Sequence, residues 1–484
     1  MTESAKAYAT LTVKNFGPIG QCSLDLRPLT VFTGPSNTGK SWCATLIYAL
    51  LNDRMGYRDW RFRSPRSQEN FPELHASFWK RLQQEEALRL SGSEIATIRP
   101  ALEPILAARG TEIERCFGLS EPEHLVSESA RPGEMSITMQ YPPSERKPEG
   151  WRYDLKAVQK WDCSLRLPES WTLGNQDEEL FYLKSLMKDS GFGSRQDELR
   201  KSFLYDNFYN KLLLDSLYRD TPRTAWYMPA DRGGIMHAHR VVVSALVRNA
   251  ARAGLAPQSR IATLSGVLAD FLENLVDLAG DPENRWRARY YMPSSTSRFP
   301  HADGLEEVLG GQVSISGRDV NYPSIVWQPQ DWERPLDLMH ASSMVTELSP
   351  VVLYLRHFVR PGDVLILEEP EAHLHPARQV EIVEQAAQWV RDGVRVILTT
   401  HSEWVLEALS NLVGTKEKGK AKKGEEEGLP ASAVGLWQFK AGKGGGSEVE
   451  EIPFDEDQGG FESGYDAVAA ALHNRWAAIV GGAE

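Results

Sequence analysis

The chain has 484 residues and a formal net charge of −12 at pH 7, and 41% of its residues are hydrophobic while 25% are charged, which describes a globular protein of one large domain with insertions or of two to three domains. The acidic balance argues against a protein that wraps along DNA by bulk electrostatics. The sequence shows no signal peptide and no apolar run long enough to span a membrane. Its four cysteines are widely separated and match neither a disulfide framework nor a metal spacing. We therefore expect a cytoplasmic protein with no membrane partner.

A glycine-framed loop is the first motif along the chain. Residues 34–41 read GPSNTGKS, which fits the pattern G-x-x-x-x-G-K-[ST], between an apolar strand expected at 29–33 and a helix expected at 41–51. Glycines let backbone N–H groups face a phosphate, Lys40 would reach the β and γ phosphates, and the Ser41 hydroxyl would ligate Mg²⁺. An ordinary glycine turn without a ligand is the alternative, and the flanking strand and helix disfavour it. The residues expected to bind the nucleotide here are Gly34, Pro35, Ser36, Asn37, Thr38, Gly39, Lys40 and Ser41.

The middle of the chain, residues 56–225, reads as mainly helical. Helical pieces at 71–90 and 194–220 are broken by short strands at 134–141 and 161–168. No heptad pattern continues for three or four repeats, so long coiled-coil arms are absent. We expect a compact insertion that serves as a dimerisation surface or reads a partner.

A strand that ends at Pro229 is followed by a loop with charged and imidazole side chains. Its H-x-H pair, His237 and His239, supplies two metal ligands where a site needs three or four. Arg232 in the same loop either interacts with a phosphate or a partner head, or packs structurally.

A helical pair is expected at 238–280. Alternating strands with glycine turns at 306–330 suggest a β-meander.

The stretch SSMVTEL follows. Ser342 or Ser343 would cap a helix that has Glu347 near its first turn, and a capping serine can also face a nucleotide.

The stretch GDVLILEEPEAHLHP, residues 362–376, predicts a buried strand that ends in two acids. The apolar run from Val364 to Leu367 suits a parallel strand covered on both faces. Ligands bind at the carboxyl end of such strands, where Glu368 would hold Mg²⁺ through water and Glu369 would orient an attacking water. The alternative is a pair of solvated acids that cap the strand.

A third element follows the expected helix at 377–393. The strand at 394–402 presents His401 at its end. A histidine there can contact the γ-phosphate and sense it, although a lone histidine is more often structural.

The end of the chain carries little chemistry. Residues 414–430 form a charge-rich loop that we expect to be solvated. The stretches 432–442 and 447–454 read as paired edge strands, and 462–480 reads as a closing amphipathic helix.

The stretches LTVKNFGPIG, GPSNTGKS, ASSMVTELSPVVLYL, LILEEPEAHLHP and ILTTHS resemble the ABC-type ATPase heads of the RecF, SMC and overcoming-lysogenisation-defect group. The resemblance covers roughly residues 9–55 and 340–412. It is strongest to the stand-alone AAA-type ATP-binding proteins, which serve as subunits of anti-phage systems such as PARIS and Septu. It implies an α/β fold: a P-loop NTPase whose ABC-type head is split by a long, mainly helical insertion.

The resemblance also implies roles for individual residues. Glu368 takes the Walker B position, where an aspartate is usual, Glu369 takes the catalytic position, and His401 is the switch histidine. Ser342 or Ser343 falls where a signature serine contacts ATP held by the opposite subunit, although the glycines of SGGQ are missing. ATP would thus be sandwiched between two heads of a homodimer.

The expected organisation has four parts: an N-terminal lobe at 1–55, the insertion at 56–225, a helical pair and meander at 226–340, and a C-terminal lobe at 341–484. The function expected is an ATP-hydrolysing switch, with ATP and Mg²⁺ as cofactors, that controls a separate effector protein in an anti-phage or toxin–antitoxin-like system. A higher oligomer of such dimers is compatible with it. The alternative is a RecF-like DNA-maintenance ATPase that clamps DNA, and a transporter subunit fits least.

Overall fold

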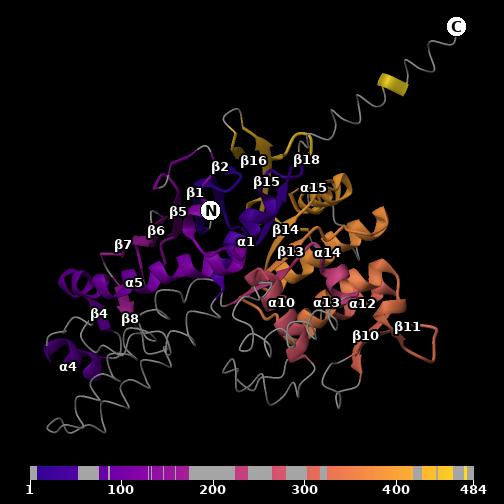
Figure 1. Ribbon diagram of the computed structural model, residues 1–484, viewed down its shortest axis with the longest axis horizontal. Coiled ribbons are helices and arrows are strands. Elements are labelled where there is room, and N and C mark those ends of the chain that lie inside the picture. The colour runs from indigo at the N-terminus through magenta and orange to yellow at the C-terminus, as the bar shows by residue number, and fades with distance from the viewer. Residues whose placement is uncertain are drawn as a thin grey trace, which may run out of the picture.

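A large mixed sheet organises the computed structural model (Figure 1). The model describes residues 8–52, 76–85, 88–128, 130–131, 133–144, 147–157, 160–169, 171–173, 224–237, 264–278, 302–316, 324–417, 428–442, 445–461 and 474–476. Within these ranges, no helix has the length and apolar character needed to cross a membrane.

The sheet has 11 strands in the order β7-β6-β5-β1-β2-β16-β15-β3-β14-β13-β9, so strands from both ends of the chain lie side by side (Figure 1). Strands β15, β3, β14, β13 and β9 are parallel, whereas β7, β6, β5, β1 and β2 are antiparallel. Strand β16 joins the two blocks, since it is antiparallel to β15 and parallel to β2. The bounds are β1 Thr10–Phe16, β2 Ile19–Asp25, β3 Leu29–Thr33, β5 Ser136–Tyr141, β6 Trp151–Ala157, β7 Trp161–Arg166, β9 Ala225–Met228, β13 Val364–Glu368, β14 Arg395–Thr399, β15 Val434–Ala441 and β16 Ser447–Ile452.

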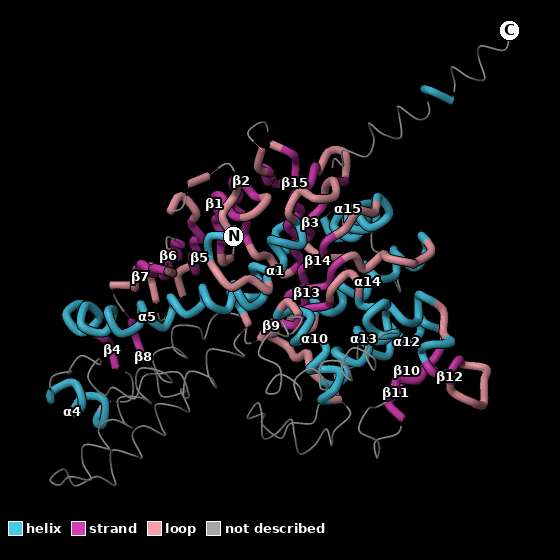
Figure 2. The backbone as a smooth tube through the Cα atoms, in the orientation of Figure 1, coloured by secondary structure: helices cyan, strands magenta, loops and turns pink. Residues whose placement is uncertain are grey.

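Helices cover both faces of the parallel block, as continuous apolar strands require (Figure 2). Along β13, Val364 and Ile366 enter the core shared with α1 and α5, while Leu365 and Leu367 enter the core shared with α13, α14 and α15. The bounds are α1 Lys40–Leu51, α4 Ala76–Gln84, α5 Gly92–Phe117, α10 Gly266–Asp277, α12 Ala302–Leu309, α13 Ser343–His357, α14 Pro376–Arg391 and α15 Glu403–Glu417. Short 3-10 turns are η1 Pro122–Leu125, η3 Leu338–His340 and η4 Ala431–Ala433.

Three small sheets lie beside the large one. The antiparallel meander β10-β11-β12 precedes α13, and β4 pairs with β8 near α4. The bounds are β4 Leu88–Leu90, β8 Trp171–Leu173, β10 Gly311–Ser316, β11 Ser324–Pro329, β12 Leu336–Asp337, β17 Phe454–Asp455 and β18 Gly460–Phe461.

The predicted α/β P-loop fold class is confirmed: a strand, a glycine loop and a helix sit in a doubly covered, largely parallel block. Three strands from the segment predicted as an insertion, β5 to β7, extend the large sheet (Figure 1). The four-part division of the chain stays a prediction.

Four local predictions were wrong. Residues 306–309, predicted to open the β-meander, are the last residues of helix α12. Residues 88–90 form strand β4 rather than helix, because they pair with β8. Residues 414–417 continue helix α15 rather than starting a loop. Strands β15 and β16 are paired as predicted, but they are not edge strands, since β15 also pairs with β3 and β16 with β2.

Other predictions fall outside the described residues. These are the helices expected at 194–220 and 238–256, and the closing helix at 462–480 apart from residues 474–476, which are helical.

Candidate functional site

Two glycines shape the loop between β3 and α1. Gly34 has φ +128° and Gly39, the N-cap of α1, has φ +95°, which only glycine adopts readily. A Cβ on Gly34 would lie 2.2 Å from the carbonyl oxygen of Phe439 on β15, and one on Gly39 would lie 2.8 Å from Ile19. The loop is therefore pressed against β15 and against the turn between β1 and β2.

The rest of the loop faces outward. Pro35, Ser36 and Asn37 are exposed, and Asn37 has φ +63°. Thr38 is buried and its hydroxyl donates to the carbonyl of Pro35 at 2.8 Å. Ser41, in the first turn of α1, is exposed. This arrangement leaves the loop open to a ligand while its own hydrogen bonds hold it.

Lys40 is a buried cation within the loop. Its Nζ donates to the carbonyls of Gly34 at 2.9 Å and Pro35 at 2.7 Å. Burial lowers its pKa from 10.5 to about 8, while nearby carboxylates act to raise it: those of Glu369, Glu371 and Glu368. The charged amine is thus held by weak acceptors that the phosphates of a nucleotide can replace.

The ends of three parallel strands bring the predicted residues together. Glu368 at the end of β13 is level with Thr399 on β14, and Thr399 is level with Phe32 on β3. Strand β14 therefore lies between the strand that carries the loop and the strand that carries the acids. Its continuation carries His401, whose pKa is affected by the charges of both Lys40 and Glu369.

Glu368 is 6% exposed, and burial raises its pKa. The hydroxyls of Ser41 and Tyr227 lie beside its carboxylate and lower the pKa, as does the N–H of Ala230, which donates to Oε2 at 3.3 Å. Its Oε1 is buried without a hydrogen-bond partner. A buried, unpartnered carboxylate oxygen beside a serine hydroxyl fits Mg²⁺, which takes one or two protein ligands together with phosphates and water. In the described parts of the chain, no group of three or more His, Cys, Asp or Glu side chains could hold a metal alone.

Glu369 and His401 face each other at the open side of the site. The distance from His401 Nε2 to Glu369 Oε1 is 3.8 Å, and the two side chains are 34% and 42% exposed. Burial and the charge of Lys40 lower the pKa of His401, against the opposing effect of Glu369 and Glu371. A neutral imidazole therefore prevails at pH 7, and the nearby Glu369 side chain is placed to orient a water.

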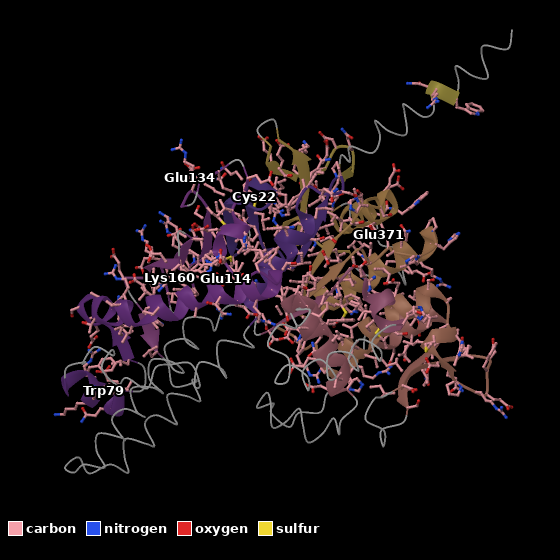
Figure 3. The ribbon with its side chains drawn as sticks, viewed as in Figure 1. Cys22, Trp79, Glu114, Glu134, Lys160 and Glu371 are labelled. Atoms are coloured by element: carbon pink, nitrogen blue, oxygen red, sulfur yellow. The ribbon has the colours of Figure 1, made fainter. Side chains whose placement is uncertain are left out.

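Glu371 is a further residue of this site, and the sequence reasoning missed it. Its Oε1 accepts hydrogen bonds from the Thr400 hydroxyl at 2.8 Å and from the N–H of His401 at 2.7 Å. Figure 3 labels it among the C-terminal elements. The only signal in the sequence is a third acid after the predicted pair, and nothing local indicates that it holds the end of β14.

Ser342 and Ser343 lie at the start of α13, where both are exposed. Ser342 is the N-cap, because its hydroxyl accepts from the N–H of Val345 at 3.5 Å. Among the described residues, no hydrogen bond or ion pair joins either serine to the loop at 34–41 of the same chain. Ser342 therefore caps helix α13, as one of the two interpretations predicted. A contact between either serine and a nucleotide would have to be made to ATP held by a second subunit.

Arg232 contacts the site at the backbone carbonyls of Glu368 and Glu369 rather than with an exposed guanidinium. It is fully buried and its guanidinium donates to backbone carbonyls, so the structural alternative is the one observed. His237 is exposed, and His239 lies outside the described residues.

The comparisons with known proteins agree with this geometry in part. The family described as "AAA domain, putative AbiEii toxin, Type IV TA system" matches residues 259–407, a span that contains Glu368, Glu369 and His401 but not the glycine loop. None of the curated proteins matches the chain. The matched span is less than a third of the chain, and the fold itself is that of a P-loop NTPase.

Three solved structures of Smc head domains match most of this chain at low identity. An Smc head bound to the C-terminal winged-helix domain of ScpA is 8% identical with a TM-score of 0.41, and covers 93% of this chain and 99% of its own. The Pyrococcus furiosus Smc head with an extended coiled coil, bound to the C-terminal domain of ScpA, is 10% identical with a TM-score of 0.39, over 93% and 98%. The Thermotoga maritima SMC head is 12% identical with a TM-score of 0.34, over 92% and 98%. Superpositions of this quality support no inference about function, which rests on the site itself.

Proposed function

We propose that this chain binds ATP with Mg²⁺ at the loop 34–41 and hydrolyses it. The observation that carries the proposal is the convergence of Lys40, Glu368, Glu369 and His401 at the carboxyl edge of β3, β13 and β14. Phosphoryl transfer needs positioned charge more than covalent chemistry, and these side chains supply both signs at one place.

Each residue has a role that follows from its position. Lys40 exchanges the carbonyls of Gly34 and Pro35 for the β and γ phosphates. Ser41 and Glu368 are the residues that would hold Mg²⁺, which supplies charge neutralisation between the phosphates. Glu369 orients the attacking water, and neutral His401 donates a hydrogen bond to the γ-phosphate.

The proposed biological role is a molecular switch. Two heads would close on ATP, with Ser342 or Ser343 of one chain facing the nucleotide of the other, and hydrolysis would loosen the pair. The matched family's description names a putative toxin of a type IV TA system, which supports a place in a toxin–antitoxin-like system. The anti-phage context and the separate effector are parts of the proposal that this description does not address.

The test is the ATPase rate of the purified chain with and without duplex DNA, beside Glu369→Gln and Lys40→Ala. We expect a rate in the wild type that DNA does not change and that both variants lose by about 10²-fold or more. A several-fold stimulation by DNA would favour the DNA-clamping alternative. A wild-type rate equal to that of both variants would contradict the proposed catalysis.

A further inference from the structure

A fully buried arginine ties the acidic turn at the end of β13 to helix α13. Arg232 is 0% exposed, and its guanidinium donates to four backbone carbonyls. Two belong to the acids of the site: Glu368 at 2.6 Å and Glu369 at 3.2 Å. The others are Glu347 on α13 at 3.0 Å and Pro229 at 3.1 Å. One side chain thus fixes the backbone of both acids to a helix that lies outside the nucleotide loop.

The carboxylate of Glu347 is the counter-ion of this arginine. Its Oε2 lies 3.3 Å from Nε of Arg232, and the Glu347 side chain is 6% exposed. Gly233 makes room for it, since a Cβ there would lie 2.2 Å from Glu347 Oε1. A buried ion pair is weak evidence of stabilisation, because desolvation opposes the attraction. The geometry that the pair fixes is therefore its more informative property.

The backbone of Glu369 needs such support. Its φ of +42° is in the left-handed region, which a residue with a long side chain keeps only where its surroundings over-determine it. Its N–H donates to the carbonyl of Thr399 at 2.9 Å and to the hydroxyl of Thr399 at 3.2 Å. Its C=O accepts from Arg232 at 3.2 Å. The same C=O also accepts from the N–H of Ala372 at 3.1 Å. Thr399 therefore holds one side of this residue, and Arg232 together with the Ala372 N–H holds the other.

We propose that Arg232 is a positioning residue that holds Glu369 in its left-handed conformation, and that Glu347 makes this hold depend on the position of α13. The inference rests on the proposed function, since it assumes that Glu369 orients the attacking water. A shift of α13, whose first turn begins at the exposed Ser342, moves both the carbonyl and the carboxylate that Arg232 contacts. The rate of hydrolysis then responds to what binds at the start of α13, while the nucleotide loop is unchanged.

Two adjacent glycines give a matched test. In Gly233→Ala the new methyl group would lie 2.2 Å from Glu347 Oε1 and so displace that carboxylate, whereas a Cβ on Gly234 meets nothing within 4 Å. We expect kcat of Gly233→Ala to fall about tenfold or more, since small misplacements of reacting groups have such effects, with ATP affinity within about twofold of the wild type. Gly234→Ala should match the wild type in both. Arg232→Lys keeps the charge but loses the planar fork, and should lose at least as much kcat.

The readouts separate positioning from a general structural role. ATP affinity is measured with a fluorescent ATP analogue, and urea unfolding confirms that each variant is folded under the assay conditions. If Gly233→Ala does not fold, Glu347→Gln removes the counter-ion while it keeps the backbone carbonyl, and it should show the same loss of kcat. The inference is overturned if the variant that folds, Gly233→Ala or Glu347→Gln, has the same kcat as Gly234→Ala. It is also overturned if that variant loses ATP affinity but not kcat. A wild-type rate equal to that of Lys40→Ala instead removes the proposed function, and this inference with it.

Discussion

The pKa of Lys40 lies near 8 rather than 10.5, mainly because the amine is buried. The unfolded chain therefore retains this proton at pH values where the folded chain has lost it. At pH values below about 8, the shift makes the free energy of unfolding smaller than it would be with an ordinary lysine. This loss of stability is recovered as the pH rises from about 8 toward 10.5, the ordinary pKa of lysine. A bound polyphosphate has the opposite effect, because an anion beside the amine favours its charged form.

We therefore expect ATP binding to take up protons at alkaline pH. At about pH 9 the free amine is mostly neutral and the bound one is charged, so binding should consume a fraction of a proton that vanishes by about pH 7. Isothermal titration calorimetry in two buffers of different ionisation enthalpy measures it. Lys40→Arg, which stays charged, is the control. Equal proton uptake by that variant would show that another group titrates.

The chemistry of single residues was more predictable from the sequence than their contacts. Lys40, Glu368, Glu369 and His401 come together because each follows a strand end, and parallel strands present these ends at one edge of the sheet. The contact of Glu371 with the backbone of His401 depends instead on how two strand ends bend toward each other. No local pattern in the sequence encodes that bend.

Helix α13 begins at a serine for which a capping and a nucleotide-binding role can be separated. Aspartate caps a helix as well as serine does, but its charge would repel the phosphates of ATP held by a partner. We expect Ser342→Asp to keep the free energy of unfolding within about 0.5 kcal/mol and to abolish ATP-dependent dimerisation. Ser342→Ala should instead lose about 1 kcal/mol of stability. Urea unfolding and light scattering measure the two properties, and dimerisation of Ser342→Asp at the wild-type level would leave the serine as a cap only.

A buried polar cluster connects helices α1, α5 and α10. Arg115 on α5 donates to Glu112 at 2.6 and 2.8 Å and to Asp270 on α10 at 2.6 and 3.1 Å. From α1, Tyr48 donates to Asp270 at 2.8 Å and Asn52 to Glu112 at 3.2 Å. The helix that follows the glycine loop is thereby anchored at its far end to both neighbours.

Removal of one acid from this cluster should be costly. Because Asp270→Ala removes an acceptor that Arg115 and Tyr48 share, and Arg115 keeps Glu112 alone as its carboxylate partner in this cluster, we expect the free energy of unfolding to fall by about 2–4 kcal/mol. The matched change is Glu450→Ala, which breaks the exposed pair with Lys440 and should change stability by less than about 1 kcal/mol. Chemical denaturation measures both, and similar losses in the two variants would contradict the assignment.

Apolar runs predicted the elements of the parallel block well, because strands covered on both faces leave a continuous signal: the expected strands at 29–33 and 364–367 correspond to β3 and β13. The prediction failed at β15 and β16, which were expected at an edge. Their neighbours β3 and β2 lie some four hundred positions earlier in the chain, and hydrophobic pattern carries no information on pairing over that separation.

Across the molecule, the proposed switch predicts a change of mass with nucleotide. Glu369→Gln should bind ATP and retain it, so the closed pair of heads should accumulate. We expect the mass of this variant, measured by light scattering, to double with Mg²⁺–ATP and to stay at the monomer value with ADP. Lys40→Ala should keep the monomer mass with both nucleotides. A variant that stays monomeric although it binds ATP would argue against the sandwiched dimer.

The position of β3 between β14 and β15 has a consequence for how the protein is made. The ribosome releases residues 29–41 long before either neighbour of β3 exists, and the second neighbour ends only at Ala441. The glycine loop, whose Gly34 is pressed against β15, cannot take its final shape until then. A nascent or truncated chain that stops earlier thus lacks the finished loop and has an open strand edge, which chaperones and proteases can recognise.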